Sequence, residues 1–74
     1  MNKLQTLQDI VYSADRNTMA SSKGRKALAH RLEEGLGYWG PPLYAFIEEM
    51  RGLNFRNRED RETFILFFQR AYTL

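Results

Sequence analysis

The residues "TFILFFQRAYTL", Thr63 to Leu74, form the densest run of apolar and aromatic side chains in the sequence. On a helical wheel their apolar groups cover roughly half of the circumference. This apolar face consists of Phe64, Ile65, Phe67, Phe68, Ala71, Tyr72 and Leu74, whereas Leu66 lies on the other side among polar residues. We therefore expect a last helix, from about Arg58 to near the C-terminus, to form the centre of the fold.

The segment before it, "PPLYAFIEEMRG", predicts a further helix. Proline lacks an amide donor, a defect that the first turn of a helix tolerates, so Pro41 and Pro42 can open this helix. Leu43, Phe46, Ile47 and Met50 then follow the i, i+3, i+4, i+7 spacing of one helical face. We expect Gly52 to end the helix in the left-handed conformation, and Asn57 with Asp60 to form a capping box for the last helix.

The N-terminal half of the sequence indicates two more helices. Leu4, Leu7, Ile10, Val11 and Ala14 share one face and predict a helix over residues 3–14. Ser21 or Ser22 is a suitable N-cap for a second helix that runs to about Glu34 and stops at Gly35. The predicted fold class is all-α: a compact single domain of three to four short helices over residues 1–74, with residues 1–15 either packed on it or loosely attached.

Composition narrows the class of protein. The chain has 74 residues, of which 43% are hydrophobic and 14% aromatic, far from the composition of disordered chains. It has no cysteine, which excludes a disulfide framework and a thiolate metal site. The N-terminus lacks the apolar core of a signal peptide, and no apolar run is long enough to span a bilayer. These features favour a cytoplasmic protein that does not enter a membrane.

The sequence offers little for catalysis. Its single histidine, His30, has Glu34 four residues on, which could orient it as a base, but no nucleophile can be matched to it. Glu48 and Glu49 point about 100° apart on a helix and lie opposite the apolar stripe, as solvated charges do. We expect no enzyme activity, and no catalytic, cofactor-binding or metal-binding residue.

A basic stretch is the first candidate for binding. Between Arg16 and Arg31 the chain has five basic residues and His30, and no acidic residue. On the wheel Lys23, Lys26 and His30 share one face, Leu28 and Leu32 lie opposite, and Arg25 and Arg31 flank the face. The helix would then dock by its leucines and present a cationic ridge, which is open to three interpretations: a solvated face, a nucleic-acid contact or a contact for an acidic protein.

The second candidate is the loop "GLGYWGPPLY", Gly35 to Tyr44, which places aromatic rings among glycines and prolines. Trp39 and Tyr38 can act as anchors in a partner protein, as stacking platforms for unpaired bases together with Tyr44, or, for Trp39, as a cap on the core. The predicted partner-binding residues are therefore Lys23, Arg25, Lys26, His30, Arg31, Tyr38, Trp39 and Tyr44.

Two resemblances bear on function. The order "ALAHRL" and then "LYAFIEEM", within residues 27–50, resembles a bacterial repressor helix-turn-helix, but the link is longer and Glu48 and Glu49 would repel DNA. Nucleic-acid binding is thus the alternative to protein binding. The whole chain resembles the small bacteriophage-encoded regulators that bind host machinery. This implies an inhibitor of bacterial transcription that binds RNA polymerase, a host protein, in the host cytoplasm; a homodimer through the last helix stays open.

Overall fold

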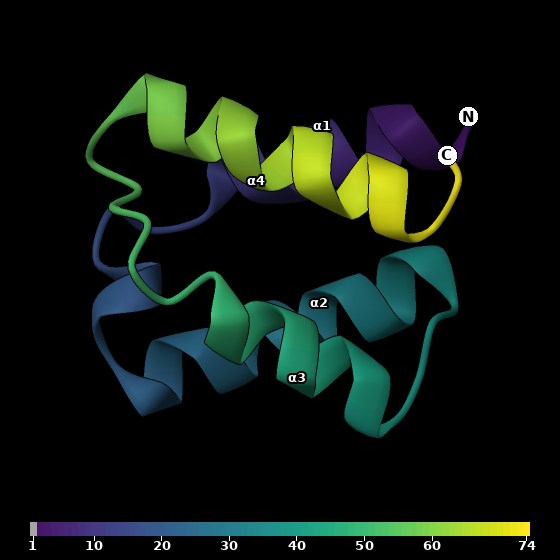
Figure 1. Ribbon diagram of the computed structural model, residues 1–74, viewed down its shortest axis with the longest axis horizontal. Helices are drawn as coiled ribbons and strands as arrows, with labels where there is room; N and C mark the ends of the chain where they lie inside the picture. The colour runs from purple at the N-terminus through teal and green to yellow at the C-terminus, as the bar shows by residue number, and fades with distance from the viewer. Residues whose placement is uncertain (1) are drawn as a thin grey trace.

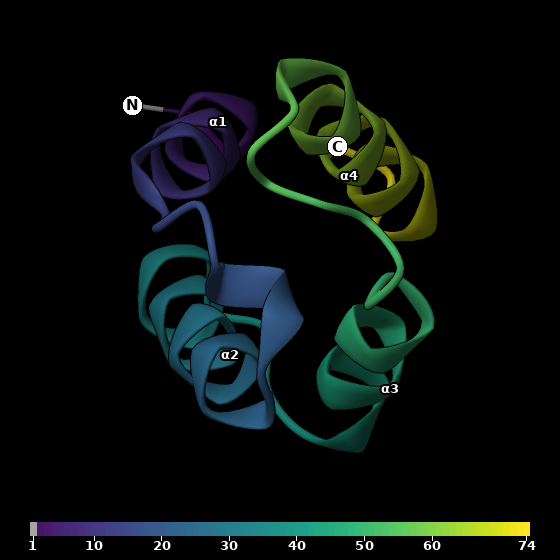
Figure 2. The ribbon, with the colours of Figure 1, turned by 90° about the vertical axis from the view of Figure 1, so that its left-hand side faces the viewer.

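The computed structural model describes residues 2–74 and confirms the all-α fold class. Within that range the helices are α1 (Lys3–Ser13), the short 3-10 helix η1 (Thr18–Ala20), α2 (Ser22–Leu36), α3 (Pro41–Glu49) and α4 (Arg58–Ala71). Figure 2 shows the four α-helices at the corners of a square, with α1 beside α4 and α2 beside α3. The molecule measures 26 × 24 × 18 Å. No helix within residues 2–74 combines the length and apolar character that crossing a membrane requires.

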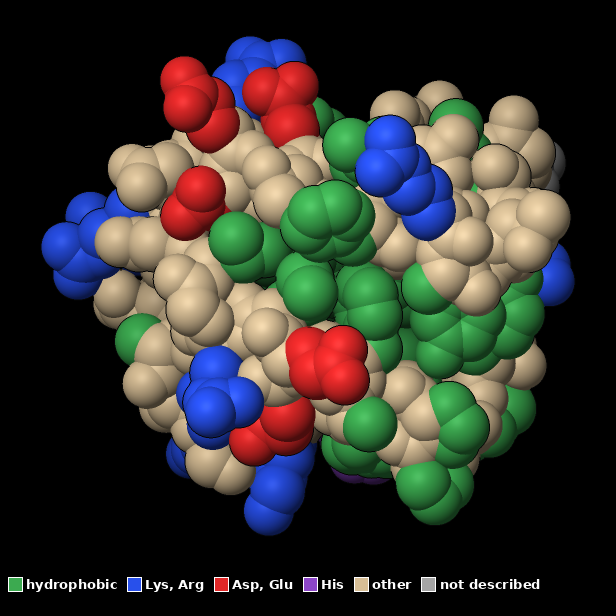
Figure 3. All heavy atoms as spheres, viewed as in Figure 1, with side chains coloured by type: hydrophobic (Ala, Val, Ile, Leu, Met, Phe, Trp, Pro, Cys, Tyr) green, Lys and Arg blue, Asp and Glu red, His purple; other side chains and the backbone are tan. Residues whose placement is uncertain are grey.

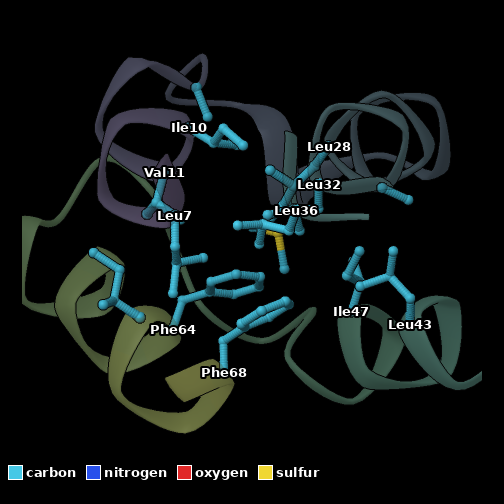
Figure 4. Packing of buried hydrophobic residues seen from close by; sticks show 14 of the residues in the cluster. Leu7, Ile10, Val11, Leu28, Leu32, Leu36, Leu43, Ile47, Phe64 and Phe68 are labelled. Carbon is cyan, nitrogen blue, oxygen red and sulfur yellow. The ribbon is translucent and has the colours of Figure 1, made fainter. Parts of the chain in front are cut away.

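The core lies where the four helices meet (Figure 4). Leu7 of α1, Leu32 of α2, Leu43 of α3 and Phe68 of α4 have no exposed surface. The N-terminal segment, whose attachment the sequence left open, therefore contributes to the shared core through α1. The burial of α1 also explains why a chain this short can fold. The apolar face of each helix is covered by several neighbouring helices, so all four are needed to form one core.

The last helix is buried over a narrower stripe than the wheel predicts. Phe64, Ile65 and Phe68 are buried, but Phe67 is 40% and Leu66 45% exposed, and Ala71 is also exposed. The apolar face is therefore wider than the part that the core covers, and Phe67 and Ala71 lie on the uncovered part. The reason is that α1 packs on one side of α4 and side chains of α3 reach it on another, which leaves the remaining side to solvent.

Two buried side chains outside the α-helices were missed. Met19 of η1 and Phe55 in the α3–α4 loop are each 1% exposed and belong to the core. The ring of Phe55 meets Phe64 edge-on, with centroids 5.6 Å apart. Neither residue lies in a periodic run, so helical spacing carries no signal for its burial.

Two predicted helix ends need correction. α2 continues through Gly35 and ends at Gly37, which has a φ of 77° and donates its N–H to the carbonyl of Glu33 at 2.9 Å. Gly35 stays helical because it lies against α1, where a Cβ would come within 2.8 Å of the Ile10 side chain. Gly52 is not left-handed; α3 ends as the Met50 N–H bonds two carbonyls of its last turn.

The predicted capping box of α4 does not form. The side chain of Asn57 makes no cap bond, and the carboxylate of Asp60 accepts the N–H of Asn54 at 2.8 Å. Asp60 therefore shapes the α3–α4 loop rather than the first turn of its own helix. At α2, by contrast, Ser21 is the N-cap and accepts the N–H of Gly24 at 3.0 Å, as one of the two predicted caps.

Arg61 connects the two halves of the chain at the end of α1. Its guanidinium donates to the carbonyls of Val11 at 2.7 Å, Tyr12 at 3.2 Å and Ala14 at 2.8 Å, and to that of Phe55 at 2.6 Å. The last carbonyls of a helix have no partner within it, and a cation there is favoured by the helix dipole. One side chain thus holds the end of α1, the start of α4 and the α3–α4 loop together.

Candidate functional site

The α2–α3 loop sends its two neighbouring aromatic rings in opposite directions. Tyr38 turns inward and stacks on Tyr72 of α4, with ring centroids 4.4 Å apart. Trp39 turns outward and is 66% exposed, more than any other large hydrophobic residue in the described chain. Gly37 and Gly40 flank the pair with φ values of 77° and 95°, which side chains other than glycine rarely adopt. The interpretation of Trp39 as a cap on the core was therefore wrong.

An apolar groove runs between α3 and α4. Backbone packing pairs α3 with α2 and α4 with α1, so aromatic rings fill the space between α3 and α4. Phe46 lies at this junction and meets Phe64 and Phe68 edge-on, each at 5.4 Å. Outside Phe46 a groove of about 300 Å³ remains, lined by Pro42, Ala45, Phe46, Glu49, Ala71 and Tyr72. Figure 3 shows hydrophobic side chains gathered over α3 and the C-terminal half of α4, with charges mainly elsewhere.

Tyr44 is a structural link rather than a free ring. Its hydroxyl donates to Oε1 of Glu33 at 3.1 Å, and this hydrogen bond, with smaller contributions from burial and from the charge of Glu33, raises the pKa of Tyr44. Glu33 is buried, and Nδ1 of His30 lies 3.6 Å from the same oxygen. The carboxylate beside His30 is thus Glu33 and not Glu34 as expected, because position i+3 faces the α3 side of α2.

The cationic ridge on α2 is narrower than predicted. Lys23, Lys26 and His30 are exposed opposite the buried Leu28 and Leu32, as the wheel predicts.

Two arginines of the predicted ridge are engaged elsewhere. The side chain of Arg25 is 16% exposed, forms an ion pair with Glu48 of α3 and donates to the carbonyl of Met19 at 2.9 Å. Arg31 donates to Oγ of Ser13 at 2.7 Å. Both arginines tie α2 to its neighbours, and Glu48, expected to be a solvated charge, is one of the partners.

The eight predicted residues do not form one surface. Lys23 lies at the start of α2 and Trp39 beyond its end, and the thirteen steps from Lys23 to Leu36 rise about 20 Å along the helix axis. The ridge and the loop therefore lie on separate parts of the surface. Trp39 instead precedes by three residues Pro42, which lines the α3–α4 groove.

A cluster of arginines was missed by the sequence reasoning. A cleft of about 570 Å³ is lined by Tyr12, Arg16, Phe55, Arg56, Arg58 and Arg61. These residues come from both halves of the chain. Residues 51–61 hold four arginines and two acids, Glu59 and Asp60, but residues 35–74 as a whole hold five charges of each sign, so the net charge of that half gave no signal. The cluster also includes Arg16, which lies in the α1–α2 loop and is distant from the other arginines in the sequence.

Within residues 2–74 no group of three or more His, Asp or Glu side chains is arranged to hold a metal ion. Comparison with known proteins matches no family model, no curated protein sequence and no solved structure. Function is therefore inferred from the surfaces of this chain.

Proposed function

We propose that the protein is a small non-enzymatic regulator that acts by binding another protein through Trp39 and the α3–α4 groove. The observation that carries the proposal is the exposure of Trp39, of which 66% is open to solvent, three residues before Pro42, which lines the apolar groove. Tryptophan is among the residues that most often dominate the energy of protein interfaces. The same loop partly buries Tyr38 but leaves the indole ring of Trp39 in water. A partner protein would bury that ring.

The loop that carries Trp39 is held in place before any partner arrives. Tyr38 is stacked on Tyr72 and lies 3.4 Å from the ammonium of Lys3, which also sits over its ring. Pro41 and Pro42 follow as the first residues of α3, with φ fixed by their rings. Because the loop is ordered in advance, binding through Trp39 would lose little conformational entropy.

The groove defines the chemistry of the partner. Five of its six lining residues offer apolar surface, and Glu49 is the charged residue at its edge. A partner surface that fits has a pocket for the indole ring, one or two apolar side chains for the groove and a basic residue opposite Glu49. Such a polar rim around an apolar centre is the usual anatomy of a protein interface.

The resemblance to small bacteriophage-encoded regulators supplies the partner class. We propose bacterial RNA polymerase as the partner, inhibition of transcription as the outcome and the host cytoplasm as the place of action. The alternative site of binding, the α2 ridge, has lost Arg25 and Arg31 to contacts within the protein. The groove is therefore the better-supported surface.

The test is co-elution of the chain with purified bacterial RNA polymerase, together with transcription from a promoter template. We expect wild type to co-elute and to inhibit, and Trp39→Ala and Ala45→Arg to lose both effects by tenfold or more. Ala27→Arg is the matched control, because Ala27 is an exposed alanine on α2, away from the groove. Binding that survives both groove variants would overturn the surface, and absence of wild-type binding would overturn the polymerase as partner.

A further inference from the structure

Two loops meet at the end of the molecule that lies opposite Trp39. The α1–α2 connection and the α3–α4 loop are side by side at the left of Figure 1 and face the viewer in Figure 2. We call this region the arginine end and define it by Arg16, Arg51, Arg56 and Arg58. Arg56 donates to Oδ1 of Asn17 at 3.0 Å, so the two loops are joined to each other.

The arginines surround one continuous depression. The cleft of about 570 Å³ described above adjoins a second one of about 370 Å³, and Arg16, Phe55 and Arg56 line both. Arg58 lines only the first cleft and Arg51 only the second. Among residues 2–74, none of those that line either cleft is acidic. The four arginines, which we call the row, therefore line two clefts that share three residues.

Within the described chain the arginines of this row have few charged partners. No carboxylate lies within 4.0 Å of the guanidinium of Arg16, Arg51 or Arg56. Arg51 donates to the main-chain carbonyl of Glu48 at 2.7 Å and Arg56 to Asn17, but these neutral acceptors do not cancel the charges. Arg58 lies 3.9 Å from Glu62, in an ion pair of exposed groups that contributes little. Arg61, which also lines the first cleft, donates to carbonyl oxygens, which are likewise neutral.

The acidic groups nearby are occupied with the backbone. The carboxylate of Asp15 accepts the N–H of Asn17 at 3.0 Å, and that of Asp60 accepts the N–H of Asn54 at 2.8 Å. Each carboxylate thus shapes one of the two loops. Glu59 and Glu62 are exposed on α4 and do not line the clefts.

We propose that the arginine end binds the phosphodiester backbone of nucleic acid. A guanidinium offers paired N–H donors that match two oxygens of a phosphate, and a row of them matches a repeating anion better than a single one. The end of the molecule measures 24 × 18 Å, which spans about five to seven phosphates of one strand at about 3.4 Å each. Four arginines are in keeping with that number of contacts.

An exposed tyrosine lies at the edge of the row. Tyr12 lines the larger cleft, and the guanidinium of Arg58 is 5.7 Å from its ring centroid. An aromatic face beside cations is the arrangement on which unpaired bases stack. Phe55 is buried and serves as the floor of the cleft. This site shares no residue with the α3–α4 groove, so it goes beyond the proposed function and can fail independently of it.

The test is fluorescence anisotropy of a labelled 20-nucleotide single strand and a 20-base-pair duplex between about 50 and 200 mM salt, the range over which phosphate contacts weaken measurably. The variant is Arg16→Gln, Arg51→Gln, Arg56→Gln. The matched control, Lys23→Gln, Lys26→Gln, Arg70→Gln, changes three exposed cations elsewhere, and both triple variants lower the net charge from +2 to −1.

We expect the arginine variant to bind at least about tenfold more weakly than the control, and the slope of log affinity against log salt to fall by about two to three as three phosphate contacts are lost. Loss of affinity for the single strand alone on Tyr12→Ala would place a base on that ring. Trp39→Ala should bind nucleic acid as wild type does.

Three results would overturn the proposal: no wild-type binding at 50 mM salt, equal weakening by the two triple variants, or displacement of the oligonucleotide by poly-glutamate of the same length and charge. The last would assign the arginine end to acidic protein. Circular dichroism melting of both triple variants checks that each retains the fold.

Discussion

The two ends of the molecule are built in different ways. At the α2–α3 end, the stacked rings of Tyr38 and Tyr72 hold a loop that leaves Trp39 in water. At the arginine end, one guanidinium, that of Arg61, holds the backbone by four carbonyls and leaves other arginines in water. In both, a half-buried side chain supports exposed side chains of the same kind: aromatic Tyr38 beside Trp39, and cationic Arg61 beside the other arginines. The comparison teaches that residue type alone does not separate the supporting residue from the binding residue.

The largest effect is expected at Arg61. Arg61→Met leaves four carbonyl groups without their donor, and each group that stays buried costs about 1–3 kcal/mol, so we expect a loss of at least about 3 kcal/mol. Arg58→Met, an exposed neighbour on the same helix, should change stability by less than about 0.5 kcal/mol. Urea unfolding measures both. Equal effects would break the distinction between supporting and exposed arginines.

The next effect compares the same substitution at two glycines. At Gly24, in the first turn of α2, a Cβ would overlap the main-chain carbonyl oxygen of Thr18, which cannot move aside as a side chain can, so Gly24→Ala should destabilise by about 1–3 kcal/mol. At Gly52, near the arginine end, nothing lies within 4 Å and φ is not positive. Gly52→Ala should be neutral or stabilise by up to about 1 kcal/mol. Thermal unfolding of both variants tests the opposite signs.

A smaller effect is expected on the exposed side of α4. Phe67 is 40% exposed, so Phe67→Ser should cost less than the roughly 3–5 kcal/mol of truncating the buried Phe68. The same variant, combined with Leu66→Ser, tests the homodimer that the sequence leaves open. If a second copy covers this side of α4, sedimentation gives a heavier species for wild type than for the variant; equal masses would contradict a homodimer through the last helix.

The smallest effect is a pH dependence at Tyr44. Its hydrogen bond to Glu33 raises the pKa of Tyr44 above the ordinary value of a tyrosine, so the folded state holds the hydroxyl proton more tightly than the unfolded state does. This contribution to stability is complete below the unfolded pKa and is lost as the pH rises through the folded pKa. Ultraviolet titration should show one tyrosine that ionises earlier in Glu33→Gln. An unchanged titration would contradict the link.

Helical periodicity predicted the existence and approximate extent of all four α-helices, because apolar spacing is a local property. Sequence signals placed the ends of α2 and α3 wrongly, at Gly35 and Gly52. The surroundings of these glycines differ, since Ile10 approaches Gly35 and open space surrounds Gly52. The end of a helix is decided partly by its neighbours.

The candidate surfaces were predicted less completely than the fold. Trp39 was identified as a candidate anchor, since a lone tryptophan among glycines and prolines has no helical face to join. Arg25 was misassigned because its partners, Glu48 and Met19, are distant in sequence or outside a helix. The arginine end was missed because it combines Arg16 with residues 51–58, and the charges around those residues balance along the chain.

The sequence by itself determined the all-α class, the four amphipathic helices and the apolar stripe of each, since these follow from the spacing of residues only a few positions apart. Only the tertiary structure decided which charged and aromatic side chains are left for binding. An arginine can either bind carbonyls within the protein or remain exposed for a partner, and an aromatic ring can either join the core or remain exposed. The outcome depends on distances between segments that are far apart along the chain. Such distances are set by the packing of the helices.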